Sequence, residues 1–186
     1  MIIAFFGISC VGKTTIGKLV ADELRYGFFD LDAEMKLFYS DTITNIQKGC
    51  FGDGFDTKKG RVLKSILDKC GDKAIISMSP IYYTTKYKQL FKNSKVFSIV
   101  LQDSPENIAN RMIDTDENDN VIDVVRDRKT DIRDARFFIS RYKKAFERIE
   151  HKYDIDGKTA YAAACEIIET IIKPYSIAIG QKEFQI

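Results

Sequence analysis

The residues with the clearest chemical potential lie near the start of the chain, in the segment GISCVGKT. This segment fits the pattern G-x-x-x-x-G-K-[ST]. In this pattern backbone N–H groups surround phosphates, and glycines allow a tight turn with close approach of the backbone. Lys13 is expected to reach the β- and γ-phosphates, and Thr14 to offer its hydroxyl to Mg²⁺. The predicted nucleotide-binding residues are Gly7, Ile8, Ser9, Cys10, Val11, Gly12, Lys13 and Thr14.

Two carboxylates follow the second short apolar run of the sequence. Asp30 and Asp32 come directly after Phe28 and Phe29. In α/β sheets, ligands gather at the carboxyl ends of strands, so Asp30 is predicted to lie beside the phosphate loop. The alternative is that both aspartates only begin the next helix, because Asp32 and Glu34 would then lie in its first turn.

Short apolar runs alternate with longer segments of helical periodicity, and this alternation predicts how the chemical residues are positioned. The runs are apolar throughout, which is typical of strands covered on both faces. Such alternation favours a parallel sheet wrapped by helices, an α/β fold. The expected strands are residues 2–6, 28–30, 74–78, 96–101 and 153–155, and the expected helices are residues 13–26, 56–70, 105–112, 134–151 and 157–173.

Residues 114–134 differ from the rest of the chain, with eight acidic and four basic side chains. We interpret this segment as a candidate lid over an active site, since lids have few buried apolar contacts. The alternative is a solvated loop and helix without a function. His151 is expected late in an amphipathic helix, and the last helix is expected to stop at Pro174. No role is assigned to residues 176–186.

Composition limits the function classes. The chain has 186 residues, 45% hydrophobic residues and a net charge of +2. These values favour one folded domain over residues 1–186 and argue against disorder. The sequence has no block of like charges, which argues against nucleic-acid binding, and no apolar run that is long enough to span a bilayer. Four widely spaced cysteines and a single histidine argue against disulfides and zinc, and favour a cytoplasmic protein.

Small size and the lack of a guanine-reading N-K-x-D sequence favour a kinase for a small metabolite or nucleotide over a GTPase switch. The sequence resembles the shikimate kinase family. The resemblance rests on the phosphate loop, on FDLD at residues 29–32, on VLQDSPENIANR at residues 100–111 and on residues 141–172. It implies a five-stranded parallel sheet in the order 2-3-1-4-5, helices on both faces, a lid, and ATP with Mg²⁺ as cofactors.

The resemblance also implies residue roles. Asp30 would orient Mg²⁺ together with Thr14, and Asp32 would bind the acceptor hydroxyl and assist its deprotonation. Arg111 would lie against the adenine. The remaining implied residues are Arg126 or Arg128 as the lid arginine that neutralises the transferring phosphoryl group, and Arg141 as a bidentate partner of an acceptor carboxylate. Asp56 is also predicted to lie in the acceptor site, at the position of a family arginine. Lid arginines could instead simply pair with neighbouring aspartates.

Three segments depart from the family pattern. Where the family has Gly-Glu-x-x-Phe-Arg, residues 52–56 read GDGFD, and an aspartate there would repel a carboxylate. A Gly-Gly-Gly turn is replaced by SMSP at residues 77–80, and the lid sequence Arg-Pro-Leu-Leu by DNVI near residues 119–122. The nucleotide half therefore looks retained and the acceptor half remodelled.

The leading hypothesis is ATP-dependent phosphoryl transfer to a hydroxyl of a small molecule. Two alternatives stay open: a nucleotide or nucleoside kinase, and a catalytically silent nucleotide-binding homologue. The sequence does not name the acceptor or the oligomeric state.

Overall fold

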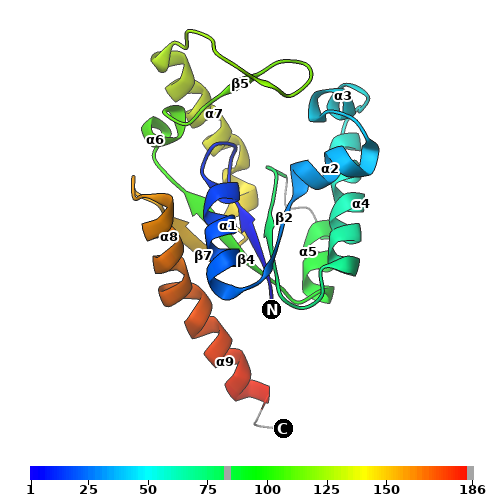
Figure 1. Ribbon diagram of the computed structural model, residues 1–186, viewed down its shortest axis with the longest axis vertical. Helices are drawn as coiled ribbons and strands as arrows, with labels where there is room; N and C mark the ends of the chain where they lie inside the picture. The colour runs from blue at the N-terminus through cyan, green and yellow to red at the C-terminus, as the bar shows by residue number, and fades with distance from the viewer. Residues whose placement is uncertain (82–84, 184–186) are drawn as a thin grey trace.

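A computed structural model of the chain describes residues 1–81 and 85–183, without the side chains of residues 85, 86 and 179–183. Its centre is a parallel sheet of five strands in the order β2-β3-β1-β4-β7 (Figure 1). This confirms the predicted α/β fold and strand order, with β7 as the fifth strand. The sheet strands are β1 (Ile2–Phe6), β2 (Gly27–Asp30), β3 (Ala74–Ser77), β4 (Val96–Gln102) and β7 (His151–Asp154).

The central strand β1 explains why the apolar runs are continuous rather than alternating. All of its residues are buried, because β3 and β4 flank it and helices cover both faces. Ile3 is in register with Ile75 of β3 and Phe97 of β4. Parallel pairing brings the carboxyl ends of all strands to one edge, where the phosphate loop follows β1.

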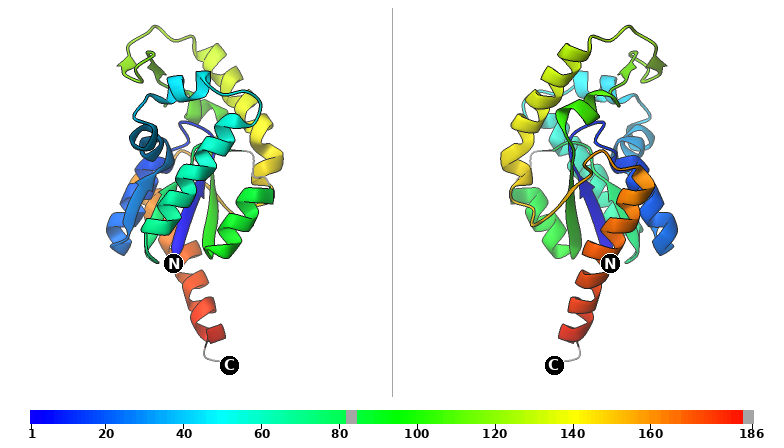
Figure 2. Two further views of the ribbon diagram at one scale, coloured as in Figure 1. Left: turned by 90° about the vertical axis from the view of Figure 1, so that its right-hand side faces the viewer. Right: turned by 90° about the vertical axis from the view of Figure 1, so that its left-hand side faces the viewer.

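Helices form a layer on each side of the sheet (Figures 1 and 2). On one face α1 packs against α8 and against β3. On the other face lie α4, α5 and α7 (Figure 2). The helices are α1 (Lys13–Leu24), α2 (Leu31–Tyr39), α3 (Ile43–Lys48), α4 (Gly54–Lys69), α5 (Thr85–Asn93), α6 (Pro105–Ala109), α7 (Arg128–Phe146), α8 (Ala160–Ile167) and α9 (Lys173–Glu183).

Both predicted boundaries of the helix expected before the last strand are wrong. The helix expected over residues 134–151 begins at Arg128, because the side chain of Asp127 accepts hydrogen bonds from the N–H groups of Lys129 and Thr130. It ends at Phe146, and His151 lies instead in β7, paired with Ile99 of the neighbouring strand.

The last helix does not stop at Pro174. A π-helical turn over Ile168–Ile172 links α8 to α9, so the helix continues past the proline. Proline cannot donate a backbone hydrogen bond, and the wider π turn directly before it accommodates the change in hydrogen bonding. Helix α9 extends away from the body of the molecule (Figure 1).

Helices α3 and α5 were not predicted, because both are short. In α5, Tyr87 and Phe91 are buried at helical spacing, but aromatic residues among lysines do not form a recognisable aliphatic stripe.

The candidate lid, residues 114–134, divides into two parts. A small antiparallel hairpin of β5 (Asp114–Thr115) and β6 (Val121–Ile122) lies above the sheet, and the rest leads into the first turns of α7 (Figure 2). Within the described residues, no helix is both long and apolar enough to cross a membrane.

Candidate active site

The phosphate loop connects β1 to α1 and requires backbone conformations that side chains disfavour. Gly7 has a φ of +146°, and a Cβ there would lie 2.7 Å from the Leu101 carbonyl oxygen. Gly12 has a φ of +110° directly before α1. Cys10 is also left-handed, with a φ of +61°. The loop conformation therefore explains the glycines of the motif and leaves Cys10 in a conformation costly for a non-glycine residue.

Lys13 lies at the first position of α1, and its ammonium turns back into the loop. The Lys13 Nζ donates to the Ile8 carbonyl oxygen at 2.7 Å. Burial lowers the pKa of Lys13 to about 8, although Asp32 and Asp30 act in the opposite direction. A buried ammonium next to the loop N–H groups is suited to bind phosphate oxygens.

Thr14, Asp30 and Ser77 form a small cluster of oxygen donors beside the loop. The Thr14 Oγ1 donates to Asp30 Oδ2 at 2.7 Å and lies 3.3 Å from Ser77 Oγ. Hydroxyl and carboxylate oxygens are ligands that Mg²⁺ prefers, so these residues fit a magnesium ion bound beside a nucleotide. Asp30 also caps α2, because its Oδ1 accepts from the N–H groups of Asp32 and Ala33. The two interpretations of Asp30 are thus compatible, with one carboxylate oxygen for each.

Asp32, on the first turn of α2, lies between the phosphate loop and a cavity. Burial and the nearby Asp30 carboxylate raise its pKa, against the opposing effects of Lys13, Lys59 and the Ser79 hydroxyl. A carboxylate with a raised pKa is better matched to proton transfer near neutral pH.

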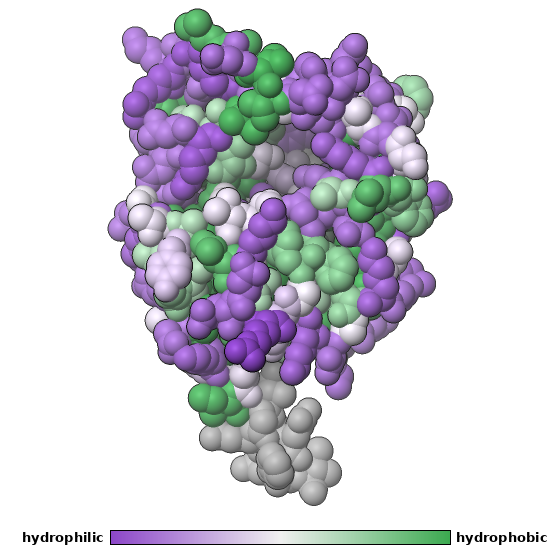
Figure 3. Space-filling view, viewed as in Figure 1, coloured by the Kyte–Doolittle hydropathy of each residue, from purple (hydrophilic) through white to green (hydrophobic). Residues whose placement is uncertain are grey.

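The cavity has a volume of about 630 Å³ and extends from the phosphate loop to α4. In the space-filling view, the molecule is hollowed between the lid side and the α2–α3 side (Figure 3). The three residues predicted for the acceptor, Asp32, Asp56 and Arg141, all line it. Its other lining residues are Ser9, Ile43, Gln47, Gly52, Asp53, Phe55, Lys59, Ser79, Pro80, Phe138 and Tyr142.

Lys59 is the main residue of this cavity that sequence reasoning missed. Its Nζ donates to the Pro80 carbonyl oxygen at 2.9 Å and lies 3.5 Å from Asp56 Oδ1. Burial lowers its pKa, while Asp56 and Asp32 oppose the change. The available signal was its position three residues after Asp56, which places both on one side of a helix.

Arg111 follows α6 and lies against the outer side of the phosphate loop. Its Nε donates to the Cys10 carbonyl oxygen at 3.1 Å, and its Nη2 pairs with Asp103. Burial alone would raise the pKa of Asp103, but hydrogen bonds from Asn107 and Arg111 hold it below its usual range. The guanidinium is thus fixed beside the predicted nucleotide site.

The two predicted lid arginines differ in their surroundings. Arg126 is held at the base of the lid: its Nε and Nη2 bind the Asp131 carboxylate at 3.0 and 2.6 Å, and its Nη1 pairs with Asp114. Arg128 is exposed on the first turn of α7. Within the described residues, Arg126 therefore has the pairing with aspartates that was the alternative to a catalytic role.

The tip of the candidate lid is attached to α2 and to the start of α3. Asp119 accepts from the backbone N–H of Ile43 at 2.8 Å and from Thr44 Oγ1 at 3.1 Å, and pairs with Lys36 at 2.9 Å. Thr42 Oγ1 donates to the Glu117 carbonyl oxygen. We call these contacts the lid latch. They connect the lid hairpin to α2 and to the start of α3.

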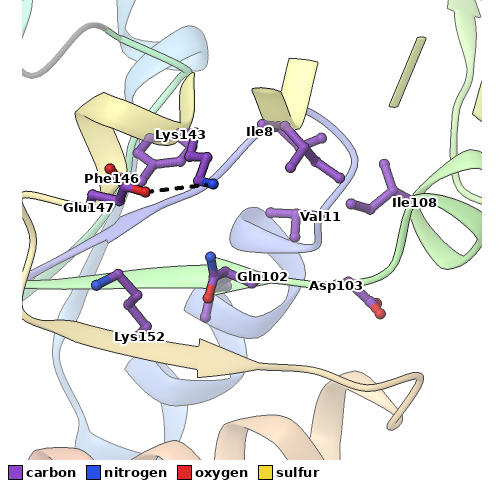
Figure 4. Close-up of a pocket in the computed structure, with 11 residues that line it drawn as sticks. Ile8, Val11, Gln102, Asp103, Ile108, Lys143, Phe146, Glu147 and Lys152 are labelled. Carbon is purple, nitrogen blue, oxygen red and sulfur yellow. Dashed lines mark ion pairs between the residues drawn. The ribbon is translucent and has the colours of Figure 1, made fainter. Parts of the chain in front are cut away.

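A second, smaller cavity of about 330 Å³ lies behind the phosphate loop (Figure 4). Ile8 and Val11 of the loop line one side of it, and Lys143 of α7 and Glu147 directly after α7 also line it and pair at 3.9 Å. Its other described lining residues are the apolar Leu101, Ile108, Ile139 and Phe146 and the polar Gln102, Asp103 and Lys152, and none of the residues predicted for the acceptor is among them.

A parallel sheet in this order, with a phosphate loop after its first strand, defines a P-loop protein of the small-kinase type. A model of the shikimate kinase family matches residues 9–172. The chain therefore belongs to the shikimate kinase family.

A match to an individual relative is consistent with membership of this family. The chain is 29% identical over 109 residues to shikimate kinase from Chlorobium limicola, a match that covers 57% of this chain and 52% of the relative. The matched segment thus spans about half the length of that curated relative.

Two solved structures share the fold over nearly the whole chain. Shikimate kinase from Bacteroides thetaiotaomicron superimposes with a TM-score of 0.75 and 15% identity, covering 91% of this chain and 97% of that one. Shikimate kinase from Acinetobacter baumannii in complex with shikimate has a TM-score of 0.75 and 20% identity, covering 93% of both chains.

Proposed function

We propose that this protein is an ATP-dependent kinase that transfers the γ-phosphoryl group to a hydroxyl of a small molecule. The observation that carries the proposal is that one cavity is lined by both Ser9 of the phosphate loop and Asp32. An acceptor in this cavity would therefore lie next to a phosphoryl group held by the loop.

The proposed roles follow from position and charge. Lys13 would bind phosphate oxygens, and Asp32, with its raised pKa, would accept the proton of the acceptor hydroxyl. Thr14 and Asp30 would hold Mg²⁺, which supplies charge neutralisation on the phosphates when bound. Arg111 would face the base of the nucleotide. Arg126 and Arg128 are both candidates for the lid arginine. For Arg126 to act in this way, its ion pairs with Asp131 and Asp114 would first have to break.

The lid would exclude water during transfer, which suppresses hydrolysis of ATP. The four free cysteines fit a reducing compartment, so we propose a cytoplasmic location. The acceptor itself is not identified by these features.

The test is a panel of small hydroxyl compounds, nucleosides and nucleotides incubated with γ-labelled ATP. We expect transfer to a small hydroxyl compound. Replacement of Lys13 by alanine should lower kcat by on the order of a hundredfold or more, because a charge that stabilises the transferring group is lost.

Circular dichroism should show that the Lys13→Ala protein is still folded. Transfer only to nucleosides or nucleotides would favour the alternative kinase class. MgATP binding without transfer to any acceptor would contradict the proposal and favour a silent homologue, as would full activity of the Lys13→Ala variant.

A further inference from the structure

The ammonium of Lys59 is buried in the acceptor cavity and is already surrounded by compensating groups. Its side chain is only 6% exposed. The Pro80 carbonyl oxygen accepts one hydrogen bond, Asp56 Oδ1 lies 3.5 Å away, and the ring centre of Phe55 lies 4.3 Å from Nζ. These contacts surround the ammonium on several sides and compensate its charge. Its attraction for an anion on the acceptor is therefore weak.

Asp56 is fixed in this position by a second helix. The Tyr87 hydroxyl of α5 donates to the Asp56 backbone carbonyl oxygen. Asp56 and Lys59 lie three residues apart on α4, so the helix itself keeps their side chains on one face. The pair is therefore a built part of the cavity wall.

The charged lining as a whole does not favour an anionic acceptor. Among the described lining residues, the carboxylates of Asp32, Asp53 and Asp56 outnumber the cations Lys59 and Arg141. Arg141 is exposed at the rim, with its guanidinium 5.9 Å from the centre of the Phe137 ring. A carboxylate on the acceptor would have to displace Asp56 from Lys59 or remain close to it, and both cost free energy.

Hydroxyl groups suit the same lining. The Ser79 Oγ is buried and lies near enough to Asp32 to lower the pKa of that carboxylate, but it makes no hydrogen bond of full geometry within the described residues. Because a hydroxyl both donates and accepts, it can bind to Ser79 and to carboxylates at once. Aromatic side chains of Phe55, Phe138 and Tyr142 offer an apolar wall for the C–H face of a ring.

From this arrangement we propose that the acceptor is an uncharged, polyhydroxylated small molecule, such as a cyclitol or sugar. Asp56 sets this preference by neutralising Lys59. The inference rests on the proposed kinase function, because it concerns the acceptor of that reaction. This preference would distinguish the chain from an enzyme that binds a carboxylate group of its acceptor.

The test compares two acceptors that differ by one charge, namely shikimate and its neutral primary amide, together with a panel of neutral cyclitols and sugars. Both binding to the MgADP complex, by calorimetry, and phosphoryl transfer are measured. We expect the amide to be favoured over the carboxylate by at least about tenfold in affinity or in kcat/KM. Some neutral polyol of the panel should be a better acceptor than either.

The Asp56→Asn variant isolates the proposed determinant. It keeps the shape of the side chain and leaves the Lys59 charge uncompensated, so the preference should move toward the carboxylate by about tenfold. Asp53→Asn removes a negative charge from the cavity but leaves Asp56 beside Lys59, so it should shift the preference between amide and carboxylate less. Asp68→Asn breaks the exposed Lys64–Asp68 pair on the same helix and should not move it.

The outcomes separate the two proposals. Transfer to carboxylate acceptors in preference to neutral ones would overturn the inference and leave the kinase function standing. The absence of transfer to any acceptor would overturn the kinase function, and the binding comparison would still decide the charge preference. Equal shifts in Asp53→Asn and Asp56→Asn, or no preference for the neutral member in binding, would overturn the role of the pair.

Discussion

Lys13 has a property that the motif alone does not reveal. Its pKa is lowered from 10.5 to about 8 because the ammonium is buried. An unfolded chain would keep the ordinary value, so between about pH 8 and pH 10.5 the unfolded state binds more protons. This residue therefore makes the folded state less stable below pH 8, and its contribution to stability rises with pH through that window.

Nucleotide binding should reverse this effect. Phosphates next to the ammonium favour its charged form, so binding of ATP should raise the pKa of Lys13 and take up protons near pH 8. Calorimetric titration at pH 8 in two buffers of different ionisation enthalpy measures the uptake. A Lys13→Met protein serves as control, and equal uptake by this protein, or no uptake by the unchanged protein, would contradict the prediction.

At the scale of elements, the lid latch joins parts of the chain that are distant in sequence. Burial alone would raise the pKa of Asp119, but hydrogen bonds from Lys36, the Ile43 N–H and Thr44 hold it below its usual range. A single carboxylate thus connects the hairpin of β5 and β6 to α2 and α3. Asp119, the first residue of the segment DNVI, is consequently the residue that anchors the hairpin turn to these helices.

Replacing Asp119 by alanine should loosen the lid and admit water to the site. Loss of these hydrogen bonds is expected to cost about 1–3 kcal/mol. We expect the ratio of ATP hydrolysis to acceptor phosphorylation to rise roughly threefold to tenfold. Phosphate release and product formation are measured in parallel. The exposed lid residue Asp123 provides the control as Asp123→Ala, and an unchanged ratio in Asp119→Ala would refute the latch.

At the scale of the whole molecule, the sheet holds both halves of the site in place. The phosphate loop follows β1, Asp30 ends β2 and Ser77 ends β3, so the site depends on the packing of three adjacent strands. Ile75 of β3 is fully buried between Ile3 and Phe28 of the neighbouring strands. The site is therefore only as rigid as this core.

Truncation of Ile75 to alanine should lower the free energy of unfolding by about 2–5 kcal/mol, because a cavity is left in a packed core. Urea denaturation followed by fluorescence or circular dichroism measures the loss. Leu37, which is 74% exposed, is the matched control, and Leu37→Ala should change stability by no more than about 0.5 kcal/mol. Similar losses in the two variants would contradict the assignment of Ile75 to the core.

Local patterns were sufficient for much of the fold and for one half of the candidate site. The phosphate loop, the five sheet strands and the position of Asp30 beside the loop were predicted from residues that are close in sequence, whereas the strand order was implied by the family resemblance. Glycine conformation, continuous apolar runs and strand-end carboxylates are all determined within a few residues. The fold and the nucleotide side could therefore be predicted from the sequence.

The candidate acceptor side was only partly predicted, because Asp32, Asp56 and Arg141 were expected there but their neighbours were decided by tertiary structure. The Lys59–Pro80 hydrogen bond and the attachment of Asp119 to Ile43 join residues separated by 21 and 76 positions. Continuation of the helix through Pro174 depends on a π-helical turn that propensity alone does not predict. The charge of a cavity depends on which side chains are packed together and buried around it. These side chains are far apart along the chain, so sequence patterns do not predict that they are neighbours.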